Sequence, residues 1–73
     1  MIYVERNDLV VGRIYTDVEP IFISATFLKL EKRTKDYLYF SYIKGFDSYS
    51  KNIDGFIKFE NNNNYSGFYE TTL

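Results

Sequence analysis

The 73-residue sequence contains no cysteine and no histidine. Without cysteine the chain can form neither a disulfide nor a thiolate metal site. Without histidine it lacks the commonest transition-metal ligand and the commonest general base of enzymes. The acidic residues are scattered, and neither they nor the four glycines match a catalytic, metal-binding or phosphate-binding spacing. We therefore expect a protein that is not an enzyme and that uses no metal or other cofactor.

A strong charge of either sign is also missing. Nine basic and ten acidic residues give a net charge of −1, whereas general binders of nucleic acid or anionic membranes carry a large basic excess. At the N-terminus, Glu5, Arg6 and Asp8 interrupt any apolar run. We therefore expect no signal peptide, no transmembrane segment and no membrane partner, and we predict a cytoplasmic location.

Aromatic residues are what the chain has in abundance, with eight tyrosines and seven phenylalanines making up 21% of it. We expect residues 1–73 to form a single domain, and a domain of this size buries only about 60% of the surface that its unfolded chain exposes. Small domains compensate with disulfides, metals or partner subunits, and the first two are excluded here. The sequence therefore predicts an aromatic core and a homo-oligomer.

Residues 36–45, DYLYFSYIKG, show the strongest structural pattern, because aromatic and β-branched side chains suit a half-buried strand. We predict that this stretch is a central strand ending at Gly45. Further strands are expected at residues 1–5, 9–16, 21–32, 56–60 and 65–72. In strand number and size this pattern resembles the SH3-like barrels. The prediction is an all-β domain: a small five- or six-stranded antiparallel SH3-like barrel or a strongly bent sheet.

Turn signals separate these strands. Residues 6–8 are expected to form a turn, and Pro20, the only proline, marks a connection or an edge. Gly12 indicates a bulge or a close backbone approach within its strand, and Gly67 indicates a bulge or a left-handed position. Residues 46–52 form either a loop or another strand, because Asp-Gly at residues 54–55 is a strong hairpin signal.

Residues 21–32 are long for one strand, and their apolar phase changes partway. A bulge near residues 25–28 or a strong bend would reconcile the two phases. A helix over residues 24–35 is the alternative, although its apolar residues do not follow a helical spacing. A hairpin loop at residues 33–35 would place Leu30 opposite Leu38 and Leu28 opposite Phe40. The opposite, outward face would then hold Lys29, Glu31, Tyr37, Tyr39 and Ser41.

The outward pair Tyr37 and Tyr39 suggests a binding patch, because tyrosine is enriched at interface hot spots. We therefore predict a non-enzymatic module that binds another protein through this aromatic face or through an edge strand. The composition favours amino acids with A/T-rich codons, which suggests a phage- or virus-encoded inhibitor of a host protein, acting in the host cytoplasm.

Two alternatives remain from the same residues. The segment KLEKRTK is the only local basic cluster, and beside aromatic rings it could bind single-stranded nucleic acid. The residues of that site would be Lys29, Lys32, Arg33, Lys35, Tyr37 and Tyr39. Alternatively, an oligomer could hold a small anionic ligand such as a nucleotide between its subunits, with Arg13 and Lys29 as phosphate contacts.

Overall fold

The computed structural model describes residues 2–19, 25–45, 55–61 and 67–71. Its elements are strands β1 (Ile2–Glu5), β2 (Ile14–Thr16), β3 (Thr26–Arg33), β4 (Tyr37–Gly45), β5 (Ile57–Glu60) and β6 (Gly67–Thr71), with a short 3-10 turn, η1 (Arg6–Asp8), after β1. The all-β prediction is confirmed. In this part of the chain no helix has the length and apolar character needed to cross a membrane.

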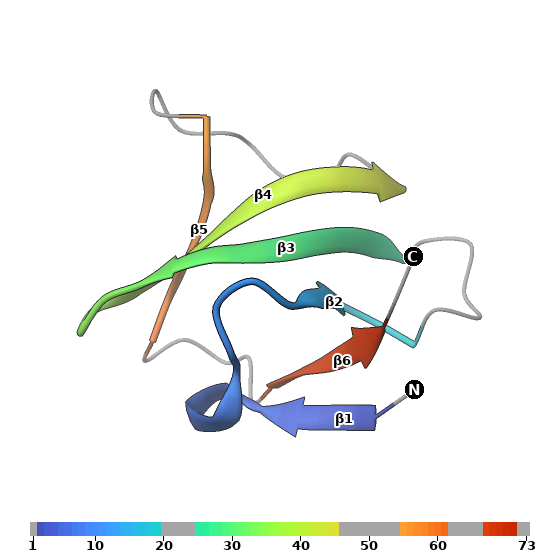
Figure 1. Cartoon of the computed structure of the whole chain (residues 1–73), viewed down its shortest axis with the longest axis horizontal. Coiled ribbons are helices and arrows are strands. Elements are labelled where there is room, and N and C mark those ends of the chain that lie inside the picture. The colour runs from blue at the N-terminus through green and yellow to red at the C-terminus, as the bar shows by residue number, and fades with distance from the viewer. Residues whose placement is uncertain (1, 20–24, 46–54, 62–66, 72–73) are drawn as a thin grey trace.

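All six strands belong to one antiparallel sheet in the order β1-β6-β2-β3-β4-β5. Strands β2 to β5 follow one another as a meander, and β6 then enters between β1 and β2 (Figure 1). The two end strands, β1 and β5, do not pair with each other over the described residues, so the sheet is bent without closing into a barrel. The strongly bent sheet is thus the form that the chain adopts.

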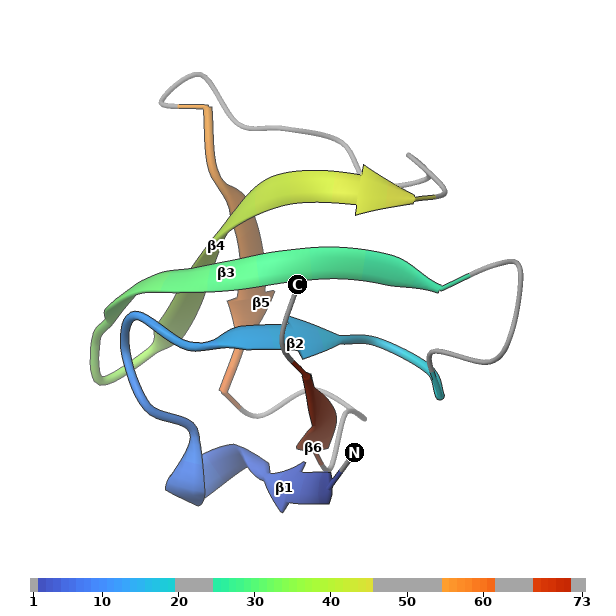
Figure 2. The same ribbon diagram turned by 45° about the vertical axis from the view of Figure 1, so that its right-hand side comes forward.

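Three phenylalanine rings show how far the sheet bends. Phe40 of β4, Phe59 of β5 and Phe68 of β6 form a triangle with centroid separations of 5.1 to 5.5 Å. Strands β5 and β6 are separated by three other strands in the sheet order, yet their rings are in contact. The sheet is therefore bent strongly enough to bring side chains of β5 and β6 into contact across its inner face, and Figure 2 shows this bend in the ribbon.

The rest of the core lines this inner face. Alternate residues of each strand point inward, as the two-residue period of a strand requires. The buried set is Leu9, Tyr15, Leu28, Leu30, Leu38, Phe40, Ile57, Phe59 and Phe68, with Val4 and Tyr42 packed against it. A chain without disulfides thus builds its core mainly from large aromatic and leucine side chains, each of which buries a large apolar area.

The β3–β4 hairpin confirms a strand rather than a helix over residues 26–33, but the predicted register is wrong by two residues. Leu30 lies opposite Phe40, and Leu28 lies opposite Tyr42. The turn occupies residues 34–36, one position later than predicted, and Glu31 is an extra residue on β3. Because the shift is even at Leu28 and Leu30, these residues and Leu38 and Phe40 lie on the predicted inner face.

A second shift in the same ladder lies between Phe27 and Leu28, where Ile43 is the extra residue on β4. The predicted bulge near residues 25–28 would lie on β3, but the extra residue here is on β4, so this irregularity leaves the alternation along β3 unchanged. Strand β4 pairs on both sides, with β3 and β5, but it is next to the edge rather than in the middle of the sheet. Predicted features at residues 20–24, 46–54 and 62–66 lie outside the described residues.

The predicted strand at residues 9–16 is much shorter, because only residues 14–16 form β2. Gly12 lies in a tight turn closed by a hydrogen bond from the Arg13 amide to the Val10 carbonyl, 3.2 Å long. Its φ of +95° is one that other residues rarely adopt, although no atom lies within 4 Å of the position that a Cβ would occupy. The Gly12 amide also donates to the Leu30 carbonyl at 2.7 Å, and the Leu30 amide donates to the Arg13 carbonyl at 3.1 Å, so Gly12 and Arg13 lie opposite one residue of β3. Gly12 is therefore both a turn residue and the first residue of the bulge that the sequence predicted.

Gly67 has a different reason for being glycine. At the start of β6 it lies opposite Glu5 of β1, and a Cβ there would collide with the Val4 carbonyl oxygen and the Glu5 Cα. The bulge or left-handed position predicted for Gly67 is wrong, because its φ is not positive and it pairs in register with Glu5; the close approach of β1 is what requires glycine here. This close approach lets β1 pair with β6, and β1 is an end strand of the sheet.

Candidate functional site

The outer face of β4 presents the two predicted tyrosines. Leu38 and Phe40 are fully buried on the inner side, so Tyr37, Tyr39 and Ser41 alternate with them on the outer side and are half-buried. The strong twist of a bent sheet leaves this convex face open to solvent between β3 and β5. The separation of inner and outer rings on β4 follows directly from the period of a strand.

Tyr39 is surrounded by side chains from three strands. It lies opposite Lys32 of β3 and opposite Lys58 of β5. The Lys32 Nζ is 5.0 Å and the Lys58 Nζ is 5.2 Å from the centroid of its ring. Tyr37 and Phe56 contact the same ring edge-to-face, with centroids 6.1 and 6.2 Å away. We call these five residues the Tyr39 cluster.

The contacts of the Tyr39 cluster fix its central ring before any ligand arrives. Each exposed cation–π contact contributes about 0.5–1 kcal/mol, and each edge-to-face pair about 0.5–1.5 kcal/mol. A ring held in one orientation loses little conformational entropy on binding. The cluster therefore offers a rigid aromatic surface with ammonium groups beside it, which suits a ligand that is apolar with a carboxylate or phosphate nearby.

Lys29 lies on the same outer face, opposite Ile14 of β2 and Ser41 of β4. Next to it, the Ser41 hydroxyl donates a hydrogen bond of 2.6 Å to the Glu31 carboxylate. Glu60 of β5 lies opposite Tyr37. Both signs of charge are therefore present on this face, and the groups in contact with the Tyr39 ring are the ammonium groups of Lys32 and Lys58.

Arg33, a predicted site residue, is not part of this surface. Its Nη1 donates a hydrogen bond of 2.6 Å to the Leu9 carbonyl, and its Nη2 donates another to the Arg6 carbonyl. The guanidinium therefore links the end of β3 to the two ends of η1, through the carbonyl of its first residue, Arg6, and the carbonyl of Leu9, which follows it. Its contacts give Arg33 a structural role.

Arg13 and Lys35 also lie apart from the Tyr39 cluster. The Arg13 guanidinium forms an ion pair with Glu70 of β6 at 3.3 Å, with the two side chains 55% and 30% exposed. Such an exposed pair contributes little to stability, and it already neutralises the arginine. Lys35 lies in the turn between β3 and β4. Of the predicted site residues, the structure brings together Lys32, Tyr37 and Tyr39, with Lys29 on the same face.

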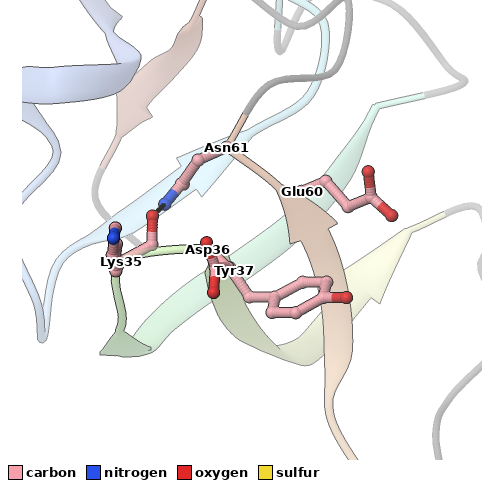
Figure 3. A pocket seen from close by; sticks show the side chains of 5 residues that line it. All are labelled: Lys35, Asp36, Tyr37, Glu60 and Asn61. Carbon is pink, nitrogen blue, oxygen red and sulfur yellow. Dashed lines mark hydrogen bonds between the residues drawn. The ribbon is translucent and has the colours of Figure 1, made fainter.

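A shallow depression of about 380 Å³ lies where β5 ends against the β3–β4 turn, lined by Lys35, Asp36, Tyr37, Glu60 and Asn61. Figure 3 shows the Asn61 amide reaching the backbone of Lys35, a bond of 2.6 Å. The Asn61 side-chain amide also donates to the Thr34 carbonyl, and the Asn61 backbone N–H donates to the Asp36 carbonyl. Asn61 thus fastens the turn to β5. Within the described ranges no three potential metal-ligating side chains gather, here or elsewhere.

Sequence reasoning did not select Phe56 and Lys58. The alternation of FIKFE places Lys58 on the side opposite the buried Ile57 and Phe59, which the sequence could have indicated. That Lys58 lies beside Tyr39 depends on the β4–β5 register, and the connection that sets it includes residues 46–54. This part of the site required the structure.

Comparisons of the chain with protein-family models, with curated protein sequences and with solved structures find no match. The interpretation of the Tyr39 cluster therefore depends on its own geometry and chemistry.

Proposed function

We propose that this chain is a non-enzymatic binding module that docks on another protein through the Tyr39 cluster. The observation that carries the proposal is the half-buried Tyr39 ring, held by Lys32, Lys58, Tyr37 and Phe56 on the outer face of the sheet. Preorganised tyrosines surrounded by polar side chains are typical of interface hot spots. In its most specific form, the module is a phage- or virus-encoded inhibitor of a host protein.

The position of the charges indicates the chemistry of the partner surface. The aromatic rings supply apolar contact area, and Lys29 and Lys32 add positive charge beside them. A matching surface would present an apolar side chain flanked by carboxylates. Stacking of nucleic-acid bases is less favourable here, because lysines from both neighbouring strands already lie over the Tyr39 ring. A base would have to displace one of them.

The test compares capture of a partner from a lysate of the native host by the wild-type chain and by matched variants. Tyr39→Ala removes the central ring, and Lys32→Glu reverses a charge while leaving the ring in place. Tyr69→Ala is the control, because Tyr69 is also half-buried and also forms an edge-to-face pair, with Tyr3 at 5.2 Å. Thermal unfolding by circular dichroism establishes that each variant is folded.

We expect one partner protein to be retained by the wild-type chain and by Tyr69→Ala, and to be lost with both other variants. Equal retention by all four chains would show that docking does not involve the Tyr39 cluster. Two further arms address the alternatives directly. Binding to single-stranded oligonucleotides that falls steeply with salt would replace the proposal with nucleic-acid binding, and a thermal shift with nucleotides would replace it with ligand sequestration.

A further inference from the structure

The two edges of the sheet are protected very differently. In the described residues, β5 and β1 are the end strands. The exposed positions of β5 are Lys58 and Glu60, and charges of this kind discourage a further strand from pairing. On β1, Ile2 is 66% exposed, and the only charged residue is Glu5. Among the described residues, the β1 edge is therefore less protected by charged side chains than the β5 edge.

The side chains of β1 divide clearly between the two faces. Val4 packs against the core and lies opposite the buried Phe68, so Ile2 and Val4 belong to the inner face. Tyr3 belongs to the outer face, where its ring contacts Tyr69 at 5.2 Å. Figures 1 and 2 both show β1 as the outermost strand on its side of the molecule. Ile2 thus continues the inner apolar row that includes Val4, but most of its side chain remains exposed to solvent in the single chain.

We propose that a second copy of the chain pairs antiparallel along β1, on a two-fold axis that passes through Tyr3. Such an axis keeps inner faces together, so only residues of the same face can lie opposite each other. The register centred on Tyr3 places Ile2 opposite the partner's Val4, and Tyr3 opposite the partner's Tyr3. A register centred on Val4 would instead place Ile2 opposite the partner's Arg6 and Tyr3 opposite the partner's Glu5, with no apolar pair apart from the central valines.

Two properties of the chain define the strength of this association. The net charge of −1 gives little electrostatic repulsion between copies. The paired edge is only four residues long, so its interface is smaller than the roughly 1,200–2,000 Å² of a stable complex. The dimer is therefore weak and depends on concentration. This proposal is independent of the Tyr39 cluster, which lies on β3, β4 and β5.

The first experiment measures mass by light scattering across about two decades of protein concentration, since the dimer fraction follows mass action. Ile2→Lys places a charge on the inner face of the edge, at a position whose exposure leaves the monomer fold intact. Val11→Lys is the matched control, because Val11 is 51% exposed in the turn before β2 and away from the edge. We expect Ile2→Lys to weaken the dimer at least about 100-fold, since two apolar side chains are replaced and each contributes roughly tenfold.

The second experiment tests the register by single cysteines, which are unique because the chain has none. In Tyr3→Cys the two sulfurs meet across the axis, where directly opposed Cα atoms are about 4.5–5.5 Å apart and a disulfide can form. In Ile2→Cys the two cysteines are offset by two residues, or about 7 Å along the strand. Added to the spacing of about 5 Å between the strands, this offset places their Cα atoms beyond the roughly 7 Å that a disulfide can span. Oxidised glutathione should therefore crosslink Tyr3→Cys into a covalent dimer much faster than Ile2→Cys.

The proposal is supported if the wild-type chain and Val11→Lys approach twice 8.7 kDa at high concentration, Ile2→Lys stays at 8.7 kDa, and Tyr3→Cys crosslinks first. A wild-type chain that remains monomeric throughout would overturn it. Equal dimerisation of both lysine variants would also overturn it, by assigning the contact to another surface. Faster crosslinking of Ile2→Cys would exclude the proposed register.

Discussion

The contact between Phe59 and Phe68 is a sensitive test of the bend in this sheet. Strands β5 and β6 share no ladder, yet these rings are 6% and 0% exposed, with centroids 5.4 Å apart at an interplanar angle of 73°. Only a strongly bent sheet can bring them together. A double-mutant cycle with Phe59→Leu and Phe68→Leu measures this one contact while keeping both positions apolar.

The size of the expected coupling follows from the geometry of the pair. Each leucine substitution should reduce the free energy of unfolding by about 1–2 kcal/mol, through lost ring contacts and a small change in volume. An edge-to-face pair contributes about 0.5–1.5 kcal/mol beyond its buried area. The double variant should therefore lose about 0.5–1.5 kcal/mol less than the sum of the two single losses. A 73-residue domain has a stability of about 4–11 kcal/mol, so all the variants should remain folded.

The assay is equilibrium unfolding in urea, followed by far-ultraviolet circular dichroism and by tyrosine fluorescence, which no tryptophan obscures. The control cycle combines Phe68→Leu with Phe27→Leu. Phe27 alternates with the buried Leu28 and therefore lies on the outer face, where its ring contacts Lys44 at 5.0 Å. Its coupling to Phe68 should stay within the additivity error of about 0.3–0.5 kcal/mol. An equally small coupling energy in both cycles would mean that Phe59 and Phe68 are not in contact and that the sheet is less bent than in this structure.

Three further predictions concern single positions and are measured by the same urea unfolding. Gly67→Ala should lower the free energy of unfolding by about 1–3 kcal/mol, because the added Cβ would collide with the Val4 carbonyl oxygen. An unchanged midpoint of urea unfolding would contradict the close approach of β1 to β6. Thr16→Val should raise the free energy of unfolding by about 1 kcal/mol, because the buried Thr16 hydroxyl has no hydrogen-bond partner in the described part of the chain. A lower free energy of unfolding would indicate that the hydroxyl does have a hydrogen-bond partner. Arg33→Met should lower the free energy of unfolding by about 1–3 kcal/mol, because it removes hydrogen bonds to backbone carbonyls. Arg13→Met removes only an exposed ion pair and should lower it by less than about 1 kcal/mol. Equal decreases for the two variants would argue against the structural role of Arg33.

The elements that depend on local pattern were predictable from the sequence. The aromatic alternation of residues 36–45 gave β4 and its two faces, because a strand turns each side chain to the opposite side of its neighbours. The insertion of β6 between β1 and β2 was not predictable in this way. It pairs segments from the two ends of the chain, and no local propensity specifies which distant strand is the neighbour.

The candidate site shows the same division. Tyr37 and Tyr39 could be placed on the outer face from alternation alone, and Lys32 was named as a nearby cation. Phe56 and Lys58 complete the Tyr39 cluster only through the register of β5 against β4. Periodicity defines the face on which a side chain lies, but it does not define the neighbour across the ladder.

The fate of Arg33 explains why the predicted basic cluster separates. Strict alternation from Lys29 would place Glu31 and Arg33 on the outer face and Lys32 on the inner one. Because Glu31 is an extra residue in the ladder, Lys32 instead lies exposed opposite Tyr39, and Arg33 turns toward the Arg6 and Leu9 carbonyls. The unpaired Glu31 thus places Lys32 on the outer face and Arg33 on the inner face, where it stabilises the fold. Lys32 and Arg33 are consecutive residues of one strand and therefore lie on opposite faces with or without this bulge, so no nucleic-acid site on the outer face can use both cations together.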